Sequence, residues 1–335
     1  MQFINYQYKV IKIDKEDKYG TTATVEDTIN INLQKKLRII EYKKDTAEFI
    51  EYMKSNYNEY RTFSYPGLVE FYFFNRIGKI DYRPVVSQKY YMTYEKLAGQ
   101  QLSKYIKNKS FEEILDLVVQ LCSTVKYLHL RGYLLCNVNA DELFVIERNE
   151  RPLLKVTSIP YIEGTDYSIM IDKDNNYFKA PETLQEQGYS KLSDIYMLGA
   201  IMFHMFNNIS IDRRNFRDSL EKFDPKNDMM LQKIKAIISK SSALSPKDRY
   251  STVDALIEDI NISFQKDYKV VDTQYIKLQP MHLLKLVSRE VYVKRLINNA
   301  KRYLYEKGDE KREAGYNIFY AAINIGAFLS GIVGG

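Results

Sequence analysis

The chain has 335 residues, of which 45% are apolar and 27% charged, and its net charge is +6. This balance is typical of an ordinary globular protein and excludes low-complexity and tandem-repeat classes. A single core stops growing at roughly 250–300 residues, so we expect more than one structural unit.

The two cysteines, Cys122 and Cys136, lack the spacing of metal ligands, which favours a reducing, cytoplasmic setting. The first twelve residues contain no apolar stretch of the length that a secretory signal needs. The histidines His129, His204 and His282 lie in apolar helical patterns, where we expect packed structural side chains.

The chain begins with a predicted β-hairpin formed by residues 7–13 and 28–32. Residues 14–20 between them are acidic and lysine-rich with the single glycine Gly20, which predicts a solvated hairpin tip. A further strand is expected at residues 37–42, followed by a helix over residues 46–56.

Several motifs follow from residue 135 onwards. Residues 135–145 read Leu-Cys-Asn-Val-Asn-Ala-Asp-Glu-Leu-Phe-Val, and residues 176–182 read Asn-Tyr-Phe-Lys-Ala-Pro-Glu. Residues 193–200 read Ser-Asp-Ile-Tyr-Met-Leu-Gly-Ala, and residues 244–250 read Leu-Ser-Pro-Lys-Asp-Arg-Tyr. In order and spacing these motifs resemble the catalytic loop, the activation-segment end and the large-lobe helices of the protein kinase family.

The resemblance covers roughly residues 5–268 and implies an α+β, bilobal kinase-like fold. A small β-rich lobe with one helix is expected over residues 1–95, and a large, mainly helical lobe over residues 96–268. A basic helical extension would then occupy residues 269–313, and a hydrophobic tail residues 314–335.

The residues that carry the family's chemistry are replaced in this chain. By the resemblance, the catalytic Asp falls on Asn137, the metal-binding Asn on Glu142 and the Asp of D-F-G on Ser158. An amide cannot accept a proton near neutral pH as a carboxylate can, and a hydroxyl is a poor ligand for Mg²⁺. No metal site is therefore expected.

The small lobe departs from the family pattern as well. The phosphate-gripping Lys falls on Ile40 or Glu41, its partner Glu falls on Asn56, and the glycine-rich loop is missing. Replacement of the Lys by Lys43 or Arg38 from a displaced position remains open.

The residues that maintain the family's architecture are present. The resemblance implies that Glu182 and Arg249 form an ion pair across the large lobe. It also implies that Asp194, at a helix start, accepts backbone N–H groups of the catalytic loop. We expect structural roles for all three.

The connection between the lobes offers Tyr94, Glu95 and Lys96 as weak candidates for contact with an adenine ring. Phosphates bound there would lie beside the negative charge of Glu142 with no metal-binding Asp nearby, and charge repulsion opposes this. We therefore expect no cofactor, with ATP binding as the open alternative.

The end of the chain changes character twice. Residues 285–313 are basic and predict helices with a solvated charged face, so they give no strong nucleic-acid signal. Residues 314–335 carry no charge and are long enough to span a bilayer, although Asn317 and Asn324 would be costly in lipid. The alternative is an apolar helix that packs on the large lobe or on a partner.

The sequence predicts a catalytically impaired kinase-like scaffold, or pseudokinase, that is cytoplasmic or anchored to the inner face of the membrane by residues 314–335. A protein partner would dock on the kinase-like cleft or on residues 161–179. The first alternative is a divergent active Ser/Thr kinase that uses Asp141, Asp166 or Asp172. The second is a membrane-bound assembly factor, because the pseudokinase component of type VII secretion machines is similar in architecture.

Overall fold

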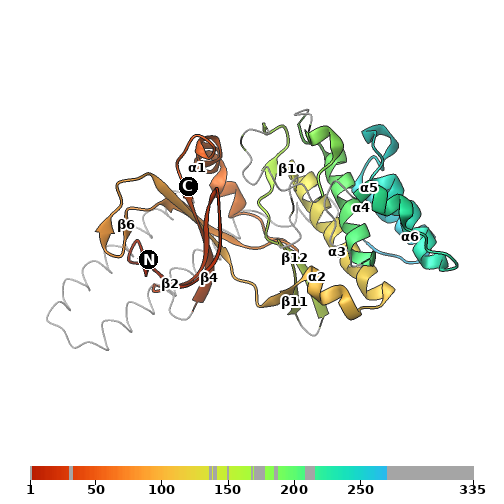
Figure 1. Ribbon diagram of the computed structural model, residues 1–335, viewed down its shortest axis with the longest axis horizontal. Helices are drawn as coiled ribbons and strands as arrows, with labels where there is room; N and C mark the ends of the chain where they lie inside the picture. Colours follow the sequence, from red (N-terminus) through yellow and green to blue (C-terminus); the bar gives the residue numbers. More distant parts are fainter. Residues whose placement is uncertain are drawn as a thin grey trace, which may run out of the picture.

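The computed structural model describes residues 2–29, 33–135, 138, 142–148, 151–166, 169, 178–184, 188–207 and 216–269. Strands dominate the first of two lobes and helices dominate the second, which follows along the chain (Figure 1). The predicted α+β, bilobal architecture is confirmed. The predicted extension and tail beyond Lys269 lie outside the described residues, as does His282.

The small lobe is built on one eight-stranded sheet with the strand order β5-β8-β4-β3-β2-β1-β6-β7. Its pairings are antiparallel throughout. Helix α1 contacts the sheet at β5. The bounds are β1 (Phe3–Ile4), β2 (Tyr8–Asp17), β3 (Gly20–Asp27), β4 (Leu33–Glu41), α1 (Ala47–Tyr60), β5 (Phe71–Arg76), β6 (Lys79–Ile80), β7 (Arg83–Pro84) and β8 (Lys89–Glu95).

The first hairpin differs from the prediction. The second strand is β3 at Gly20–Asp27, not residues 28–32, and it pairs with β2 from Tyr8 opposite Asp27 to Asp17 opposite Gly20. The threonines and valine of β3 suit a strand, and the two residues Lys18 and Tyr19 suffice for the turn. The expected solvated tip is also wrong for Tyr19, whose side chain is buried in the main core.

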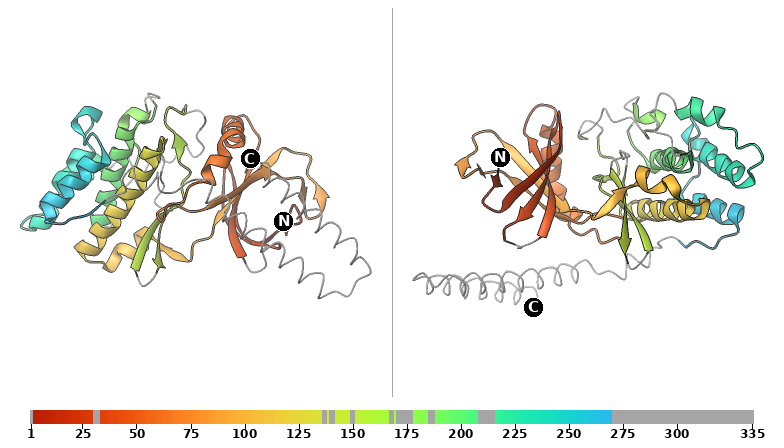
Figure 2. Two further views of the ribbon diagram at one scale, coloured as in Figure 1. Left: turned by 180° about the vertical axis from the view of Figure 1, so that it is seen from behind. Right: turned by 60° about the horizontal axis from the view of Figure 1, so that its bottom comes forward.

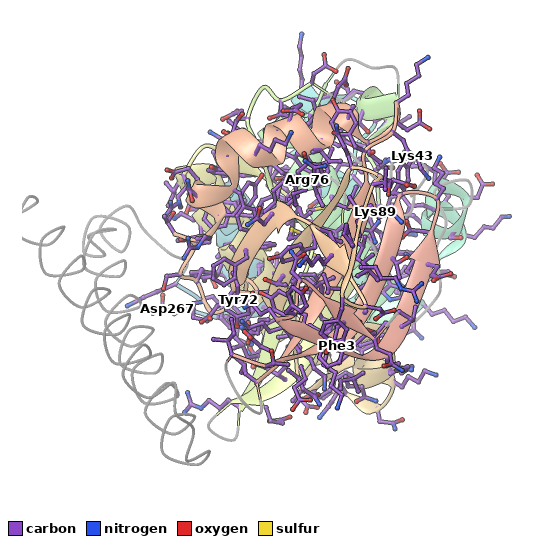
Figure 3. All side chains as sticks on the ribbon, turned by 90° about the vertical axis from the view of Figure 1, so that its left-hand side faces the viewer. Phe3, Lys43, Tyr72, Arg76, Lys89 and Asp267 are labelled. Carbon is purple, nitrogen blue, oxygen red and sulfur yellow. The ribbon has the colours of Figure 1, made fainter. Side chains whose placement is uncertain are left out.

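The outer end of the small lobe carries its own small core. Strands β1, β6 and β7 extend the sheet, and Ile4, Tyr8 and Ile77 pack there against the outer face of β3 and β4. Figure 3 looks onto this end, where Phe3 comes from β1 and Tyr72 and Arg76 come from β5.

The large lobe contains the long helices α3 and α4, which pack against each other, with α6 on α4 and α7 on α3 (Figure 2). Helix α3 begins with a capping box between Ser110 and Glu113, whose carboxyl pKa falls to about 2 through the Ser110 N–H and Lys109. The helices are α2 (Leu102–Tyr105), α3 (Phe111–Leu130), α4 (Lys191–Asn207), α5 (Phe216–Lys222), α6 (Met229–Ser241) and α7 (Val253–Phe264).

Short strands and turns of 3₁₀ helix complete this lobe. Strand β11 lies between β9 and β12, and β10 pairs with β13. Within the described residues, no helix is both long enough and apolar enough to cross a bilayer. The bounds are β9 (Gly99–Gln101), β10 (Tyr133–Leu134), β11 (Leu143–Arg148), β12 (Arg151–Val156), β13 (Tyr161–Ile162), η1 (Ile106–Asn108), η4 (Pro181–Leu184) and η5 (Pro246–Asp248).

Candidate functional site at the junction of the lobes

Two of the replaced chemical positions contact each other. The Ser158 hydroxyl donates to Oε2 of Glu142 at 2.8 Å, and Ser158 is 2% exposed. The Thr157 N–H also donates to the Glu142 carbonyl at 2.9 Å, which joins the start of β11 to the end of β12. Asn137, the third of these positions, lies outside the described residues.

This pair is poorly suited to a magnesium ion. Mg²⁺ prefers anionic oxygens in octahedral geometry, whereas here the single carboxylate of Glu142 accepts a hydrogen bond from the Ser158 hydroxyl. Among the described residues, no three His, Cys, Asp or Glu side chains gather where they could hold a metal. A surface hollow of about 610 Å³, lined in part by Arg217, Lys235 and Leu244, belongs instead to the α5–α6 side of the large lobe.

The positions that would form an ion pair in the small lobe are apolar or internally bonded. Ile40 is fully buried in the core cluster that runs through both lobes. The Asn56 side-chain amide donates to the Tyr52 carbonyl within α1, at 2.9 Å. Glu41 instead pairs with the exposed Lys43, at 2.8 Å. These contacts give α1 no charged link to β4 through Ile40 and Asn56.

A chain of tyrosine hydroxyls joins α1 to the large lobe. Tyr60 donates to the Pro160 carbonyl at 2.5 Å, and its oxygen lies 3.0 Å from the Tyr52 hydroxyl. The Tyr52 oxygen in turn accepts the Ile162 N–H at 3.0 Å. Because Tyr60 has used its proton, Tyr52 donates to Tyr60, and the chain of bonds is complete.

The tip of the first hairpin is held from inside the small lobe. Arg38 of β4 forms a two-pronged ion pair with Asp17, with both nitrogen–oxygen distances at 3.1 Å. Arg38 also donates to the Thr22 hydroxyl at 3.1 Å. Arg38 is therefore engaged at the tip of the hairpin, and Lys43, the other open substitute for the Lys, is bound to Glu41.

The connection between the lobes is fixed by a strong pair. Lys155 of β12 contacts Oε2 of Glu95 at 2.5 Å and donates to the Leu68 carbonyl at 3.3 Å. Lys96 donates to the Gln34 side chain at 2.5 Å. Burial raises the pKa of the Tyr94 phenol, the charge of Arg38 opposes this rise and the charge of Glu142 adds to it.

The residues expected to be structural are joined by close contacts. Oδ2 of Asp194 accepts the Leu135 N–H at 2.9 Å and lies 2.8 Å from Nε2 of His129. Arg249 meets both carboxylate oxygens of Glu182, at 2.7 and 2.8 Å, and the Ser193 hydroxyl donates to the same carboxylate. The start of α4 is thereby tied to the segments before and after it.

Sequence reasoning missed three features of this site. It did not foresee the Asp194 contact of His129, the hydroxyl chain of Tyr52 and Tyr60, or the Asp17 pair. A signal for Asp17 was present, because Asp three residues before Gly at a strand end is typical of a β-turn. The tyrosines of α1 gave no comparable pattern.

Comparison with known proteins agrees with this arrangement. A family model described as protein kinase domain matches residues 19–262. The M. tuberculosis PknI kinase domain superposes with a TM-score of 0.57 at 15% identity, covering 79% of this chain and 98% of that one. An identity this low shows the fold alone.

Two curated relatives are kinases by their descriptions. The interferon-induced, double-stranded RNA-activated protein kinase of Mus musculus is 26% identical over 175 residues, which are 49% of this chain and 34% of that protein. The probable serine/threonine-protein kinase PknB of Lactococcus lactis is 20% identical over 209 residues, 58% of this chain and 33% of that protein. The chain thus spans about a third of the length of these relatives.

Proposed function

The chain belongs to the protein kinase domain family, and from this membership we propose that it is a pseudokinase, a kinase-like scaffold that does not transfer phosphate. The observation that carries the proposal is the hydrogen bond from Ser158 to Glu142. It joins the two positions where the family holds its metal ions, and it leaves no pair of acidic side chains there.

The small lobe supports the proposal. Phosphoryl transfer depends on positioned positive charge and metal ions around the phosphates. Ile40 supplies no charge at the strand position, and Asn56 bonds to its own helix. The Lys155–Glu95 pair and the tyrosine chain link the two lobes through the protein's own side chains.

A fixed fold without chemistry is suited to binding another protein. We place the partner's docking surface at the lobe junction and on residues 161–179, of which part lies outside the described residues. Residues 314–335 would hold the scaffold at the inner face of a membrane, because they carry no charge over the length of a span.

A divergent active Ser/Thr kinase is the rival function, favoured by the descriptions of the curated relatives. The side chain of Asp166 is exposed, whereas Asp141 and Asp172 lie outside the residues that the structure describes. Such an enzyme would need one of these carboxylates to take over metal or base duty.

An assay with labelled ATP distinguishes the pseudokinase from the active kinase. The purified full chain is incubated with Mg²⁺ or Mn²⁺, with and without casein, beside the triple variant Asp141→Ala, Asp166→Ala, Asp172→Ala. A pseudokinase gives the same background in both proteins. Incorporation by the parent chain that disappears in the triple variant would overturn the proposal.

Cell fractionation tests the remaining alternative, a membrane-bound assembly factor. Deletion of residues 314–335 should move the protein from the membrane fraction to the soluble fraction if this segment is the anchor. Unchanged partitioning of the shortened chain would remove both the anchor and the assembly-factor function that depends on it.

A further inference from the structure

The carboxylate of Asp17 is surrounded by hydrogen-bond donors at the tip of the first hairpin. Its Oδ1 accepts the N–H groups of Tyr19 and Gly20, at 2.9 and 3.0 Å, and the Nη2 group of Arg38 at 3.1 Å. Its Oδ2 accepts Nη1 of Arg38, also at 3.1 Å. Four donors therefore converge on one small anionic group.

These donors are of the kind that binds a phosphate oxygen. Successive backbone N–H groups form an anion-binding concavity, and a guanidinium fork binds oxyanions with two parallel bonds. An Asp at the first position of a β-turn needs only the two N–H groups to cap the turn. The Arg38 guanidinium is additional to the turn, and it makes the arrangement a site for a charged group.

The position of the Asp17 carboxylate relative to the lobe junction follows from that of Arg38. Arg38 and Ile40 are two residues apart on β4, so their side chains lie on the same face of the sheet. Ile40 packs in the core shared by both lobes. Arg38 is 8% exposed and lies opposite Met92 of β8, which packs in the same core. The Asp17 carboxylate and its donors thus lie on the side of the sheet that faces the lobe junction.

The turn itself is closed against the strand beside it. Gly20 is paired with Ile40, and a Cβ atom at Gly20 would lie 1.9 Å from the Ile39 carbonyl oxygen. Tyr19 is 7% exposed and packs in the same cluster as Ile40. The hairpin tip therefore packs against β4, and the Tyr19 and Gly20 N–H groups point toward the Asp17 carboxylate.

We propose that Asp17 is the built-in occupant of an oxyanion site, and that it keeps phosphate groups of any ligand away from the Tyr19 and Gly20 N–H groups and Arg38. This rests on the proposed function in one respect, since both hold that the lobe junction does not take up the phosphates of a nucleotide. Burial alone would raise the pKa of Asp17, but Arg38 and the two N–H groups hold it below its usual range. The carboxylate accordingly stays charged at neutral pH.

Removal of the charge should open the site. The full chain and its variants Asp17→Asn and Asp17→Ala are titrated with sodium pyrophosphate at low ionic strength with EDTA present, by calorimetry and by thermal shift. We expect both variants to bind pyrophosphate at least about tenfold more tightly than the parent chain, whose binding should be too weak to saturate. Asp17→Asn retains an oxygen that can cap the turn, so it frees the Arg38 guanidinium while the two N–H groups stay capped, and it reports even if Asp17→Ala does not fold.

Two controls make the result specific. Asp14 lies on the same strand and accepts Nζ of Lys36 at 2.9 Å and the Thr24 hydroxyl at 2.8 Å, so Asp14→Asn removes a comparable carboxylate and should gain nothing. Arg38→Met added to Asp17→Asn should abolish the gain. Folded Asp17 variants that bind no better than the parent, an equal gain in Asp14→Asn, or equally tight binding by the parent would each overturn the inference.

The outcome is independent of the transfer assay. The Asp17 variants should bind pyrophosphate and still incorporate no label from ATP, because Ser158, Glu142 and Ile40 are unchanged in them. Label incorporated by the parent chain would refute the pseudokinase proposal and leave the pyrophosphate comparison to decide the role of Asp17.

Discussion

Ser158 and Glu142 are hydrogen-bonded to each other at 2.8 Å, hydroxyl to carboxylate, at the end of β12 and the start of β11. The backbone bond from Thr157 to the Glu142 carbonyl fixes the same two segments. A hydroxyl suits this place because it has a proton to donate. A second carboxylate there would have none at neutral pH.

The first prediction concerns Ser158→Asp. The new carboxylate would share its space with that of Glu142, so the folded variant should take up a proton that the unfolded chain does not hold. Since the folded state then binds more protons, its stability should fall as pH rises. Urea unfolding at about pH 5 and about pH 8 should show the larger loss at the higher pH.

Ser158→Ala is the matched control. It removes one hydrogen bond to a charged acceptor, which costs about 1.5–3 kcal/mol, and it adds no charge, so its loss should change little between the two pH values. A Ser158→Asp variant as stable at about pH 8 as the parent would contradict the closeness of the two groups.

The second prediction concerns Glu182→Gln. This change leaves the buried guanidinium of Arg249 without its counter-charge and should lower the free energy of unfolding by about 3–5 kcal/mol. Lys191→Ala, which breaks the exposed pair of Lys191 with Glu163, should cost less than about 1 kcal/mol. Chemical denaturation of the three proteins measures both, and equal losses would argue against a structural role for the Glu182 pair.

The same pair predicts a pH dependence. Burial would raise the pKa of Glu182, but Arg249 and Ser193 hold it below its usual value of 4.5. The stability that it contributes is therefore present above 4.5 and is lost as pH falls through the lower folded pKa. An acid titration of unfolding should be less steep in Glu182→Gln than in the parent chain; identical curves would refute this.

The third prediction concerns the hydroxyl chain of α1. Tyr60→Phe leaves the Pro160 carbonyl without its donor in a buried place and should cost about 1–3 kcal/mol. Tyr52→Phe should speed hydrogen exchange at the Ile162 N–H, read by mass spectrometry.

A double-mutant cycle tests whether the two tyrosines act together. Because they share one bond, the losses in Tyr52→Phe and Tyr60→Phe should not add in the double variant. The exposed Tyr42 is the control, and Tyr42→Phe should stay within about 0.5 kcal/mol of the parent. Strict additivity would contradict a continuous chain.

The fourth prediction concerns Cys122. Its thiol is fully buried, and burial raises its pKa to about 12, so almost no reactive thiolate exists at neutral pH. Iodoacetamide should label Cys122 slowly in the folded chain and rapidly in urea, as mapped by peptide mass spectrometry. Fast labelling at Cys122 in the folded state would contradict the packing of α3.

The sequence predicted the parts of this molecule that rest on local patterns. Helix α4 begins beside Asp194 as expected, and the strand predicted at residues 37–42 lies within or next to β4 at Leu33–Glu41. The bilobal fold was expected from the resemblance of these motifs, in order and spacing, to those of the protein kinase family. The roles proposed for Asn137 and for residues 314–335 lie outside the described residues and stay predictions.

Other parts could not be predicted because they depend on distant contacts. Tyr60 bonds to Pro160, a hundred residues further along the chain, and nothing in either neighbourhood indicates the partner. The burial of Tyr19 at the hairpin tip was not predicted, because the acidic and basic residues around it suggested solvent. In the structure Arg38 of β4 pairs with Asp17 of the tip, and the ring of Tyr19 packs in the core.

The tyrosine chain of α1 ends on main-chain atoms, a carbonyl at Pro160 and an N–H at Ile162. Every amino acid supplies that carbonyl, and every one except proline supplies that N–H. The side chains at positions 160 and 162 can therefore change without removing either bond, whereas Tyr161 between them packs its ring against Tyr52. The two phenols of α1 are the parts of this link that evolution has to preserve.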